Sequence, residues 1–473
     1  MASPLIISVS GLRGEIGQTL TPEVAMHYVL AYASVLREEY EEGLFVVTRD
    51  GRRSGEMLAD AIHSALNGIG FSTLDGDVAA TPTTGLLIRE YEAIGGIQIS
   101  ASHNPRQYNG IKLFSAEGRV IPKLLGEKVL QRYRELENNL NSQKGSSFVQ
   151  WVDVEKLGER TFIEDTTSFH LRQVLATVDV PQIRNKKFKV LLDSNHGAGG
   201  ILGRRLLDEL GCEVVFLGDE PNGDFEHTPE PIVENLKSVF EKVQKAKVDI
   251  GFCQDPDADR LALIDADGNY IGEEYTVALC SKNRLEKLYE MNQPLGNIVI
   301  NCASSRMSID IANQFEVDCC RSAVGEANVV DLMIAQNAVF GGEGNGGPID
   351  PKVGFVRDSF VGMANILDAM ARRNLSVAQL AAEIPKYSIV KRKITLLLEK
   401  VPAVLDGISS HYSNQKQNNL DGLRIDWDNA WVLIRASNTE PIVRVIAEAQ
   451  TESEANRIAD EIETVIHKLV ENP

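Results

Sequence analysis

Three segments of the chain repeat one plan: a short apolar run, a polar loop, a helical pattern and a second apolar run. They lie at residues 44–74 and 190–217 and, in a looser form, at 298–320. Short, continuous apolar strands that alternate with helices are typical of a parallel or mixed sheet with helices on both faces. The repeat therefore predicts three related α/β domains in tandem, each with a mixed sheet.

The last part of the chain follows a different pattern. Strand-like runs lie at 387–398, 431–435 and 442–448. After them, Thr451 with Glu454 forms a capping box that opens a final helix. This order predicts a smaller C-terminal α+β domain. We expect four domains, which span residues 1–155, 156–268, 269–386 and 387–473.

Composition excludes several classes of partner. The 67 acidic and 48 basic residues give a net charge of −19, so the overall field repels polyanions and argues against nucleic acid. The chain has no run approaching the ~18 apolar residues that span a bilayer, and residues 1–14 lack a basic region followed by a long apolar one. We therefore expect a cytoplasmic protein without membrane contact. The six cysteines include no Cys-x-x-Cys pair, which favours buried thiols. A monomer and a homodimer are both compatible with these numbers.

The segment Ser100-Ala-Ser-His-Asn-Pro105 follows an apolar strand at 96–99. Because Asn-Pro here and Asn-Gly shortly afterwards favour turns, we expect Ser102 on a tight loop with an accessible hydroxyl. A plain turn of small polar residues explains the segment equally well. Two other glycine-containing turns carry Arg13 and Arg52, which would add positive charge near Ser102 unless they are simply solvated.

Asp255, Asp257 and Asp259 alternate along a loop that follows another apolar run. Carboxylates at this spacing can converge on a hard cation, which prefers oxygen ligands. The loop is not an EF-hand, because Arg260 and Ala266 stand where that motif needs glycine and glutamate. Mg²⁺ fits better, since it keeps open positions for water or phosphate oxygens. The alternative is a solvated acidic turn.

A glycine-dense loop at 341–348 carries Glu343 and Asn345. Its glycines match a dinucleotide-binding fingerprint literally, but Pro348 follows where that motif needs a helix, so the match is accidental. A close backbone approach together with a glutamate and an asparagine suits a polyhydroxylated ligand. The alternative is a plain flexible turn.

A fourth motif combines arginines and hydroxyls. Arg435, Ser437, Asn438 and Thr439 lie in one turn, and Arg444 lies on the strand that follows. Guanidinium groups, hydroxyls and successive backbone amides can together bind a phosphate dianion. The alternative is a surface turn whose arginine pairs with a neighbouring glutamate.

In this order, the four motifs resemble those of the α-D-phosphohexomutase family, and the resemblance covers essentially the whole chain. It implies a heart-shaped fold of four domains with a central active-site cleft. It also implies a phosphoserine at Ser102, with Mg²⁺ held by that group and the three aspartates. We assign further catalytic roles to Lys112, Arg260 and Arg13. We assign substrate binding to His103, Glu343, Asn345, Arg435, Ser437, Asn438, Thr439 and Arg444.

The resemblance implies that phosphoserine 102 converts a hexose monophosphate to a hexose 1,6-bisphosphate, that the sugar then turns, and that its other phosphate returns to the serine. Lys112 is the expected general acid/base, because a lysine crowded by cations has a lowered pKa. Many bacterial members carry Ser-Gly-His where this chain has Asn345-Gly-Gly347, so the sugar is less well defined than the reaction. Among phosphoglucosamine, phosphogluco- and phosphomannomutases, we favour the first.

Two other functions stay open at this point. An aspartate-nucleophile sugar phosphatase also places Asp-x-Asp after a strand. A non-catalytic sugar-phosphate sensor would keep the same pocket, although the intact serine and aspartates argue against it. The sequence assigns no role to His196 or Arg52 and does not identify what phosphorylates Ser102.

Overall fold

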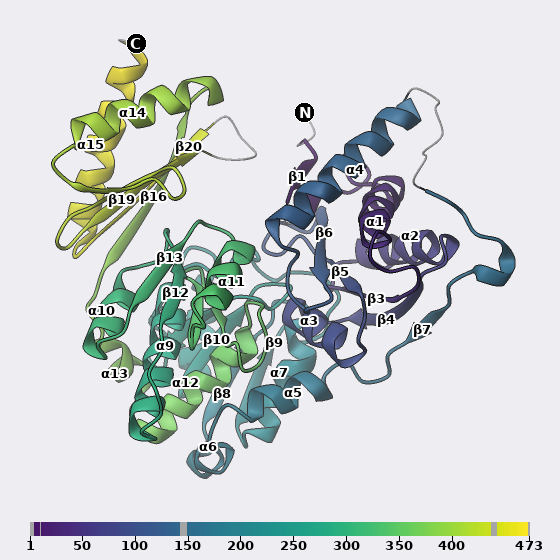
Figure 1. Cartoon of the computed structure of the whole chain (residues 1–473). Helices are drawn as coiled ribbons and strands as arrows, with labels where there is room; N and C mark the ends of the chain where they lie inside the picture. Colours follow the sequence, from purple (N-terminus) through teal and green to yellow (C-terminus); the bar gives the residue numbers. More distant parts are fainter. Residues whose placement is uncertain (1–3, 10, 142–148, 437–441, 472–473) are drawn as a thin grey trace.

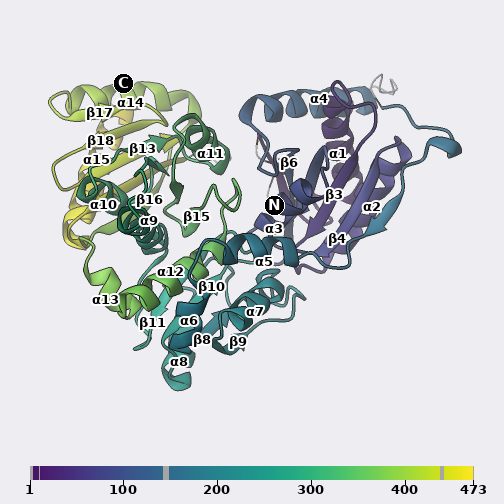
Figure 2. The ribbon, with the colours of Figure 1, turned by 60° about the horizontal axis from the view of Figure 1, so that its bottom comes forward.

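The computed structural model describes residues 4–9, 11–141, 149–436 and 442–471. Four sheets follow one another along the chain (Figure 1). In Figure 2, domain I lies on one side, domains III and IV lie on the other, and domain II lies below and between them, which gives a heart-shaped outline. Over the described residues, no helix is both long and apolar enough to cross a membrane.

The first three sheets share a core of four strands. In each sheet, the first strand pairs in parallel with the second and the third, and the fourth runs antiparallel to the third. The spatial order is therefore fourth, third, first, second in all three domains. The sequence repeat revealed only the βαβ half of this unit. The structure confirms three related α/β domains with mixed sheets.

Domain I adds three strands to the common core. Its strands are β1 (Ile6–Ser8), β2 (Gly11–Glu15), β3 (Leu44–Arg49), β4 (Ser72–Val78), β5 (Gly95–Ile99), β6 (Tyr108–Ser115) and β7 (Arg160–Phe162). Its helices are α1 (Pro22–Leu36), α2 (Ser54–Gly68), α3 (Thr81–Glu90) and α4 (Lys123–Asn141). Strands β1 and β2 extend the sheet beyond β6. Strand β7 pairs with β4, so a strand from beyond residue 155 completes this sheet.

Domain II contains the four core strands alone. They are β8 (Lys189–Asp193), β9 (Glu213–Leu217), β10 (Ile250–Gln254) and β11 (Leu261–Asp265). The helices of this region are α5 (Ser168–Leu175), α6 (Val180–Lys186), α7 (Gly199–Glu209) and α8 (Lys237–Ala246). All five residues of β10 are buried, as expected for a strand covered on both faces.

Domain III repeats this arrangement and shares a core with domain II. Its strands are β12 (Ile298–Asn301), β13 (Cys319–Ser322), β14 (Phe340–Glu343) and β15 (Gly347–Ile349). Its helices are α9 (Glu273–Glu290), α10 (Met307–Gln314), α11 (Glu326–Ala335), α12 (Ser359–Arg373) and α13 (Val377–Ala382). Helix α12 contacts α5, α6 and α7, so one hydrophobic cluster runs through both domains. Domains I and IV contain separate clusters.

Domain IV is the expected α+β unit. Its antiparallel sheet contains β16 (Ser388–Thr395), β17 (Lys416–Asn418), β18 (Leu423–Asp426), β19 (Trp431–Ala436) and β20 (Ile442–Ala449). Helices α14 (Val401–His411) and α15 (Glu452–Glu471) complete the domain. The hydroxyl of Thr451 accepts a hydrogen bond from the Glu454 amide at 3.3 Å, which caps the start of α15 as expected. A small cluster of Cys302, Trp431 and Leu433 joins domain IV to domain III.

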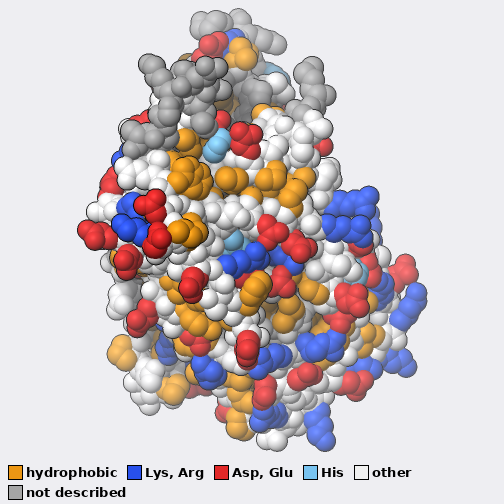
Figure 3. Space-filling model, turned by 90° about the vertical axis from the view of Figure 1, so that its right-hand side faces the viewer, with side chains coloured by type: hydrophobic (Ala, Val, Ile, Leu, Met, Phe, Trp, Pro, Cys, Tyr) orange, Lys and Arg blue, Asp and Glu red, His pale blue; other side chains and the backbone are white. Residues whose placement is uncertain are grey.

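The acidic residues do not form one continuous patch on the face in Figure 3. This view shows Asp and Glu side chains interspersed with Lys and Arg side chains over the described part of that face. Opposite charges also pair with each other in the structure. Arg160, for example, lies 2.8 Å from Asp60 and also binds Asp75 at 2.5 Å.

Candidate active site

The serine, aspartate and glycine-dense motifs of the first three domains lie at one equivalent position, whereas Arg13 and Lys112 lie on strands β2 and β6. The serine loop connects β5 to β6, the aspartate loop connects β10 to β11, and the glycine-dense loop connects β14 to β15. Each loop therefore joins the third and fourth strands of its core. The contacts described below bring the three loops together.

Ser102 is held tightly against domain II. Its side chain is buried, and its backbone has a φ of +49°, in the left-handed region that few residues other than glycine adopt. The Ser102 amide donates to the Ser100 hydroxyl at 2.8 Å. Its own hydroxyl donates to Oδ2 of Asp255 at 2.8 Å. The expected carrier hydroxyl thus lies directly beside the aspartate loop, and the expectation that it is accessible was wrong, because contacts with both domains enclose Ser102.

The three aspartates form a compact buried cluster. One carboxylate oxygen from each lies within 4.8 Å of the others. Burial, and then the carboxylates of Asp259 and Asp257, raises the pKa of Asp255 well above its usual range. Within the described chain, no hydrogen-bond donor reaches Oδ1 of Asp257 or Oδ1 of Asp259. Oxygen ligands that converge in this way, two of them without partners, fit a hard divalent cation such as Mg²⁺.

Lys112 lies between two of these aspartates. Its Nζ is 2.5 Å from Asp257 and 3.0 Å from Asp259, and it also approaches the hydroxyl of Thr81 at 3.4 Å. Burial opposes the charge, but the two carboxylates outweigh it and raise the pKa of Lys112. The expected lowering of this pKa was wrong, because carboxylates rather than cations are the nearest charged groups.

Arg357 connects the aspartate loop to the glycine-dense loop, and the sequence analysis did not identify it. Its guanidinium lies 2.6 Å from Oδ2 of Asp259, 2.9 Å from Oε2 of Glu343 and 3.4 Å from Oε2 of Glu326. It precedes α12, whose N-cap is Asp358. No local pattern marks a buried arginine here, since its three partners come from three other segments.

Glu343 and Asn345 differ in how many of their side-chain oxygens already have hydrogen-bond partners in the protein. Oε1 of Glu343 accepts from the side chain of Asn301 at 2.7 Å and from the amide of Gly325 at 3.1 Å. Both Glu343 oxygens are therefore in use once Arg357 is counted. Oδ1 of Asn345 is buried and accepts no hydrogen bond from the described residues. Asn345 thus keeps an acceptor for a ligand.

Three more predicted residues surround the cluster. Nε of Arg260 lies 3.8 Å from Asp259 and 4.0 Å from Asp255. Arg13 reaches the side chain of Asn104 at 3.4 Å. Burial, and then the charges of Arg260 and Arg13, holds the pKa of His103 well below its usual value. Nδ1 of this imidazole lies 3.3 Å from the hydroxyl of Ser102.

The predicted phosphate turn is described only in part. Ser437, Asn438 and Thr439 lie outside the described residues. Arg435 and Arg444 are cross-strand partners on β19 and β20, and Nε of Arg435 lies 3.0 Å from Asp421. The structure thus places the two arginines side by side on domain IV.

His196 lies on the loop after β8, which touches the aspartate loop where the amide of Ala198 donates to the carbonyl of Pro256 at 2.7 Å. Its Nδ1 is 2.9 Å from the carbonyl of Glu220, and its backbone carbonyl accepts from the Gly223 amide at 3.0 Å. These bonds hold the loop of domain II that packs against Gly51 of domain I. The His196 backbone is thus part of the contact between domains I and II.

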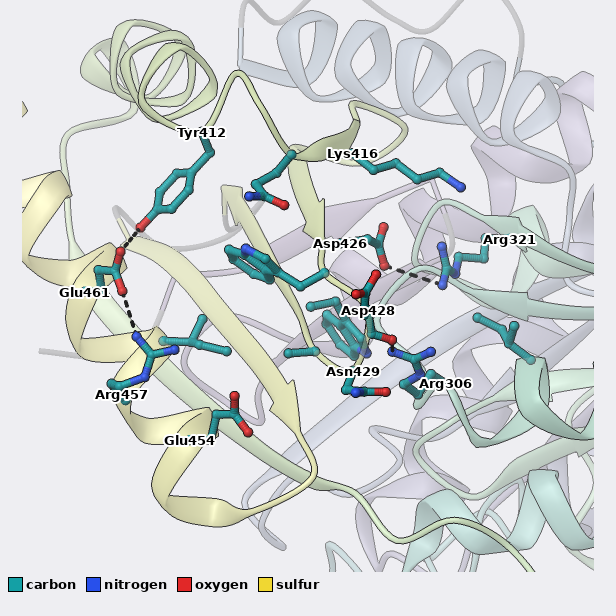
Figure 4. A pocket seen from close by; sticks show the side chains of 16 residues that line it. Arg306, Arg321, Tyr412, Lys416, Asp426, Asp428, Asn429, Glu454, Arg457 and Glu461 are labelled. Atoms are coloured by element: carbon teal, nitrogen blue, oxygen red, sulfur yellow. Dashed lines mark hydrogen bonds and ion pairs between the residues drawn. The ribbon is translucent and has the colours of Figure 1, made fainter.

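A separate pocket of about 800 Å³ lies between domains III and IV (Figure 4). None of the predicted site residues lines it. Many of its charges pair with one another: Arg457 and the Tyr412 hydroxyl bind Glu461 at 3.1 and 2.8 Å, and Arg321 lies 3.6 Å from Asp426. This pocket is not the site that the four motifs predict.

Comparisons with known proteins agree with this arrangement. Models described as phosphoglucomutase/phosphomannomutase, alpha/beta/alpha domains I, II and III and C-terminal domain, match residues 5–140, 168–268, 272–387 and 387–465. A phosphoglucomutase/phosphomannomutase of Thermococcus kodakarensis is 34% identical over 448 residues, which cover 94% of both chains. A probable phosphoglucosamine mutase of Thermococcus gammatolerans is 31% identical over 98% of both chains.

The solved structures give the same result for the fold. A phosphoglucomutase/phosphomannomutase family protein of Burkholderia thailandensis superimposes with a TM-score of 0.83 at 23% identity, and 99% of each chain is covered. All four domains of the chain are therefore accounted for by one architecture. The chain belongs to the phosphoglucomutase/phosphomannomutase family, the phosphohexomutases that its motifs resemble.

Proposed function

We propose that this protein interconverts hexose 6-phosphates and hexose 1-phosphates through a phosphorylated Ser102. The observation that carries the proposal is the hydrogen bond of 2.8 Å between the Ser102 hydroxyl and Asp255, within a buried cluster of three aspartates. Phosphoryl transfer depends on position and on charge neutralisation, and this arrangement supplies both.

Asp255, Asp257 and Asp259 would hold Mg²⁺, together with the phosphate on Ser102. When bound, Mg²⁺ neutralises negative charge that develops on the transferred phosphoryl group. A bond forms between the sugar hydroxyl oxygen and phosphorus as the bond from phosphorus to Oγ of Ser102 breaks, and the proton that the sugar hydroxyl loses ends on the serine oxygen. Lys112 is our candidate proton donor for that oxygen, since its Nζ is buried among the aspartates, one of which binds the Ser102 hydroxyl. Arg260 and Arg13 add positive charge around the transfer.

The remaining residues would bind and orient the sugar phosphate. Glu343 and Asn345 read ring hydroxyls, while Arg435, Arg444 and the turn between them hold the phosphate that does not react. The bisphosphate then turns end for end, and its other phosphate returns to Ser102. We favour glucosamine phosphate as the preferred substrate, in keeping with the name of the Thermococcus gammatolerans relative.

The test is the phosphorylation state of the protein and the activity of Ser102→Ala. Intact-mass spectrometry should find a fraction with one phosphate, which peptide mapping places on Ser102. Ser102→Ala should lose mutase turnover and keep its thermal midpoint within a few degrees, because Asn104, Pro105 and Ser100 still shape the loop. A phosphoenzyme that survives acid and carries phosphate on serine contradicts the aspartate-nucleophile phosphatase. A fully active Ser102→Ala variant would contradict the proposal itself.

A further inference from the structure

Arg52 is a fully enclosed arginine whose guanidinium binds the backbone of the serine loop. Its side chain is among the largest buried ones in the protein, with 2% of the residue exposed. It donates to the carbonyls of Ser102 at 2.6 Å, Asn104 at 2.7 Å and Pro105 at 2.9 Å. Its charge is therefore directed to loop carbonyls, and the expectation that it simply adds charge near Ser102 was incomplete.

The same cluster holds the other side of Ser102. Nε of Arg52 donates to Oδ2 of Asp50 at 3.0 Å, and that oxygen also accepts from the Ser100 hydroxyl at 2.6 Å. The Ser100 hydroxyl in turn accepts from the Ser102 amide at 2.8 Å. The amide and the carbonyl of Ser102 are thus fixed through one buried ion pair. This support matters because Ser102 adopts a φ of +49°, which its own side chain disfavours.

Residues of domain II also contact Arg52. The guanidinium lies 4.9 Å from the centre of the Phe225 ring. Gly223 packs so closely that an added Cβ would lie 2.8 Å from Cα of Arg52. Domain II also supplies Asp255, the acceptor for the Ser102 hydroxyl. Arg52 therefore lies at the interface of domains I and II. The relative position of these two domains determines the distance between Ser102 and Asp255.

We propose that Arg52 is a positioning residue for phosphoryl transfer. By binding three carbonyls of the serine loop, it holds the Ser102 hydroxyl at hydrogen-bond distance from Asp255 in the aspartate loop. It acts through the loop, since four of the five N–H groups of its guanidinium donate to acceptors of the protein. This inference rests on the proposed role of Ser102.

The test compares Arg52→Lys with Arg53→Gln as a matched control. Lysine keeps the charge beside Asp50, but its single nitrogen cannot reach three carbonyls at once. Arg53 is the next residue, and its side chain is 82% exposed, with one ion pair to Asp224. We expect Arg52→Lys to lower kcat about 100-fold with KM within about threefold of the wild type, because a displacement of ~1 Å at the reacting atom has effects of this size. Arg53→Gln should match the wild type.

Amide hydrogen exchange over residues 100–106 supplies a readout that does not require activity. Exchange there should be faster in Arg52→Lys and unchanged in Arg53→Gln. If the wild type proves inactive as a mutase, the proposed function fails, while exchange still reports whether Arg52 holds the loop. If Arg52→Lys does not fold, Phe225→Leu loosens the same guanidinium, and it should raise exchange and lower kcat to a smaller extent.

Two results would overturn the role of Arg52. One is unchanged loop exchange in Arg52→Lys or, where that variant does not fold, in Phe225→Leu. The other is a wild-type kcat in Arg52→Lys, or a rise in KM alone, which would indicate a direct contact with substrate.

Discussion

Among the described residues, Asp257 and Asp259 each accept hydrogen bonds at only one of their two carboxylate oxygens. Oδ2 of Asp257 binds Lys112 and Thr81, and Oδ2 of Asp259 binds Lys112 and Arg357. Their Oδ1 atoms are buried and receive no hydrogen bond from any described residue. An unsatisfied buried polar atom typically costs roughly 1–3 kcal/mol of folding free energy. The cluster is therefore preorganised for a ligand that binds oxygen.

A cation at these oxygens predicts the effect of Asp257→Asn. The variant should lower kcat at least about 10³-fold, because it removes a charged oxygen from the metal site and weakens charge neutralisation in the transition state. Excess chelator should cause the same loss in the wild type, and Mg²⁺ should restore it. Asp224→Asn, which changes a half-exposed carboxylate, is the control. Full wild-type turnover in excess chelator would contradict a metal mechanism.

At the scale of the elements, the hairpin loops of domains II and III support each other. The carbonyl of Gly346 accepts a hydrogen bond from the amide of Leu261, the first residue of β11, at 2.8 Å. Gly346 has a φ of +88°, and an added Cβ would lie 2.5 Å from the carbonyl oxygen of Leu261. A backbone atom within a strand cannot move away easily. The glycine-dense loop of domain III is thus hydrogen-bonded to β11, the strand that follows the aspartate loop of domain II.

We therefore expect Gly346→Ala to be destabilising and to reduce activity. The positive φ should cost roughly 1–2 kcal/mol, and the backbone clash should add about 1–3 kcal/mol. Gly17→Ala is a matched control, because Gly17 also has a positive φ, +75°, and its Cβ would meet nothing within 4 Å. Denaturant unfolding should separate the two contributions. If both variants lose the same free energy of unfolding, the contact with Leu261 contributes nothing to stability.

The elements also show what the sequence could predict. The short apolar runs and the polar loops after them predicted three α/β domains and placed Ser102 and the aspartates on loops, because these are local patterns. Arg357 reaches Asp259 across 98 residues, and Arg52 reaches Ser102 across 50. The first contact depends on how two domains pack, so no local signal could reveal it. The raised pKa of Lys112 escaped prediction for the same reason. Arg52 was expected near Ser102, but its bonds to the loop carbonyls depend on how two loops of domain I pack and were not predicted.

At the scale of the whole molecule, residues from all four domains would have to serve one substrate in two orientations. Turning the hexose end for end exchanges the surroundings of C2 and C4 and leaves C3 near the centre. Glu343 already binds Arg357, Asn301 and Gly325, which leaves it little freedom to follow one substituent. The site should therefore discriminate weakly at C2.

We expect glucosamine, glucose and mannose 1-phosphates all to be converted, with kcat/KM values within about two to three orders of magnitude of one another. Glu343→Gln should lower all three together, because it weakens a contact common to both orientations. The measurement is kcat/KM for each sugar on the wild type and on the variant. A preference above about 10⁴ for one sugar, lost selectively in Glu343→Gln, would show that this loop reads C2.

The equivalent placement of the three loops bears on how such a protein can diversify. The proposed phosphate carrier, the cation ligands and the sugar-reading residues occupy the same connection in three copies of one unit. After duplication, each copy can accumulate substitutions for its own task while the other two retain theirs. A lineage can therefore change its preferred sugar by substitutions within residues 341–348 and inherit the phosphorylation chemistry of the other two copies intact.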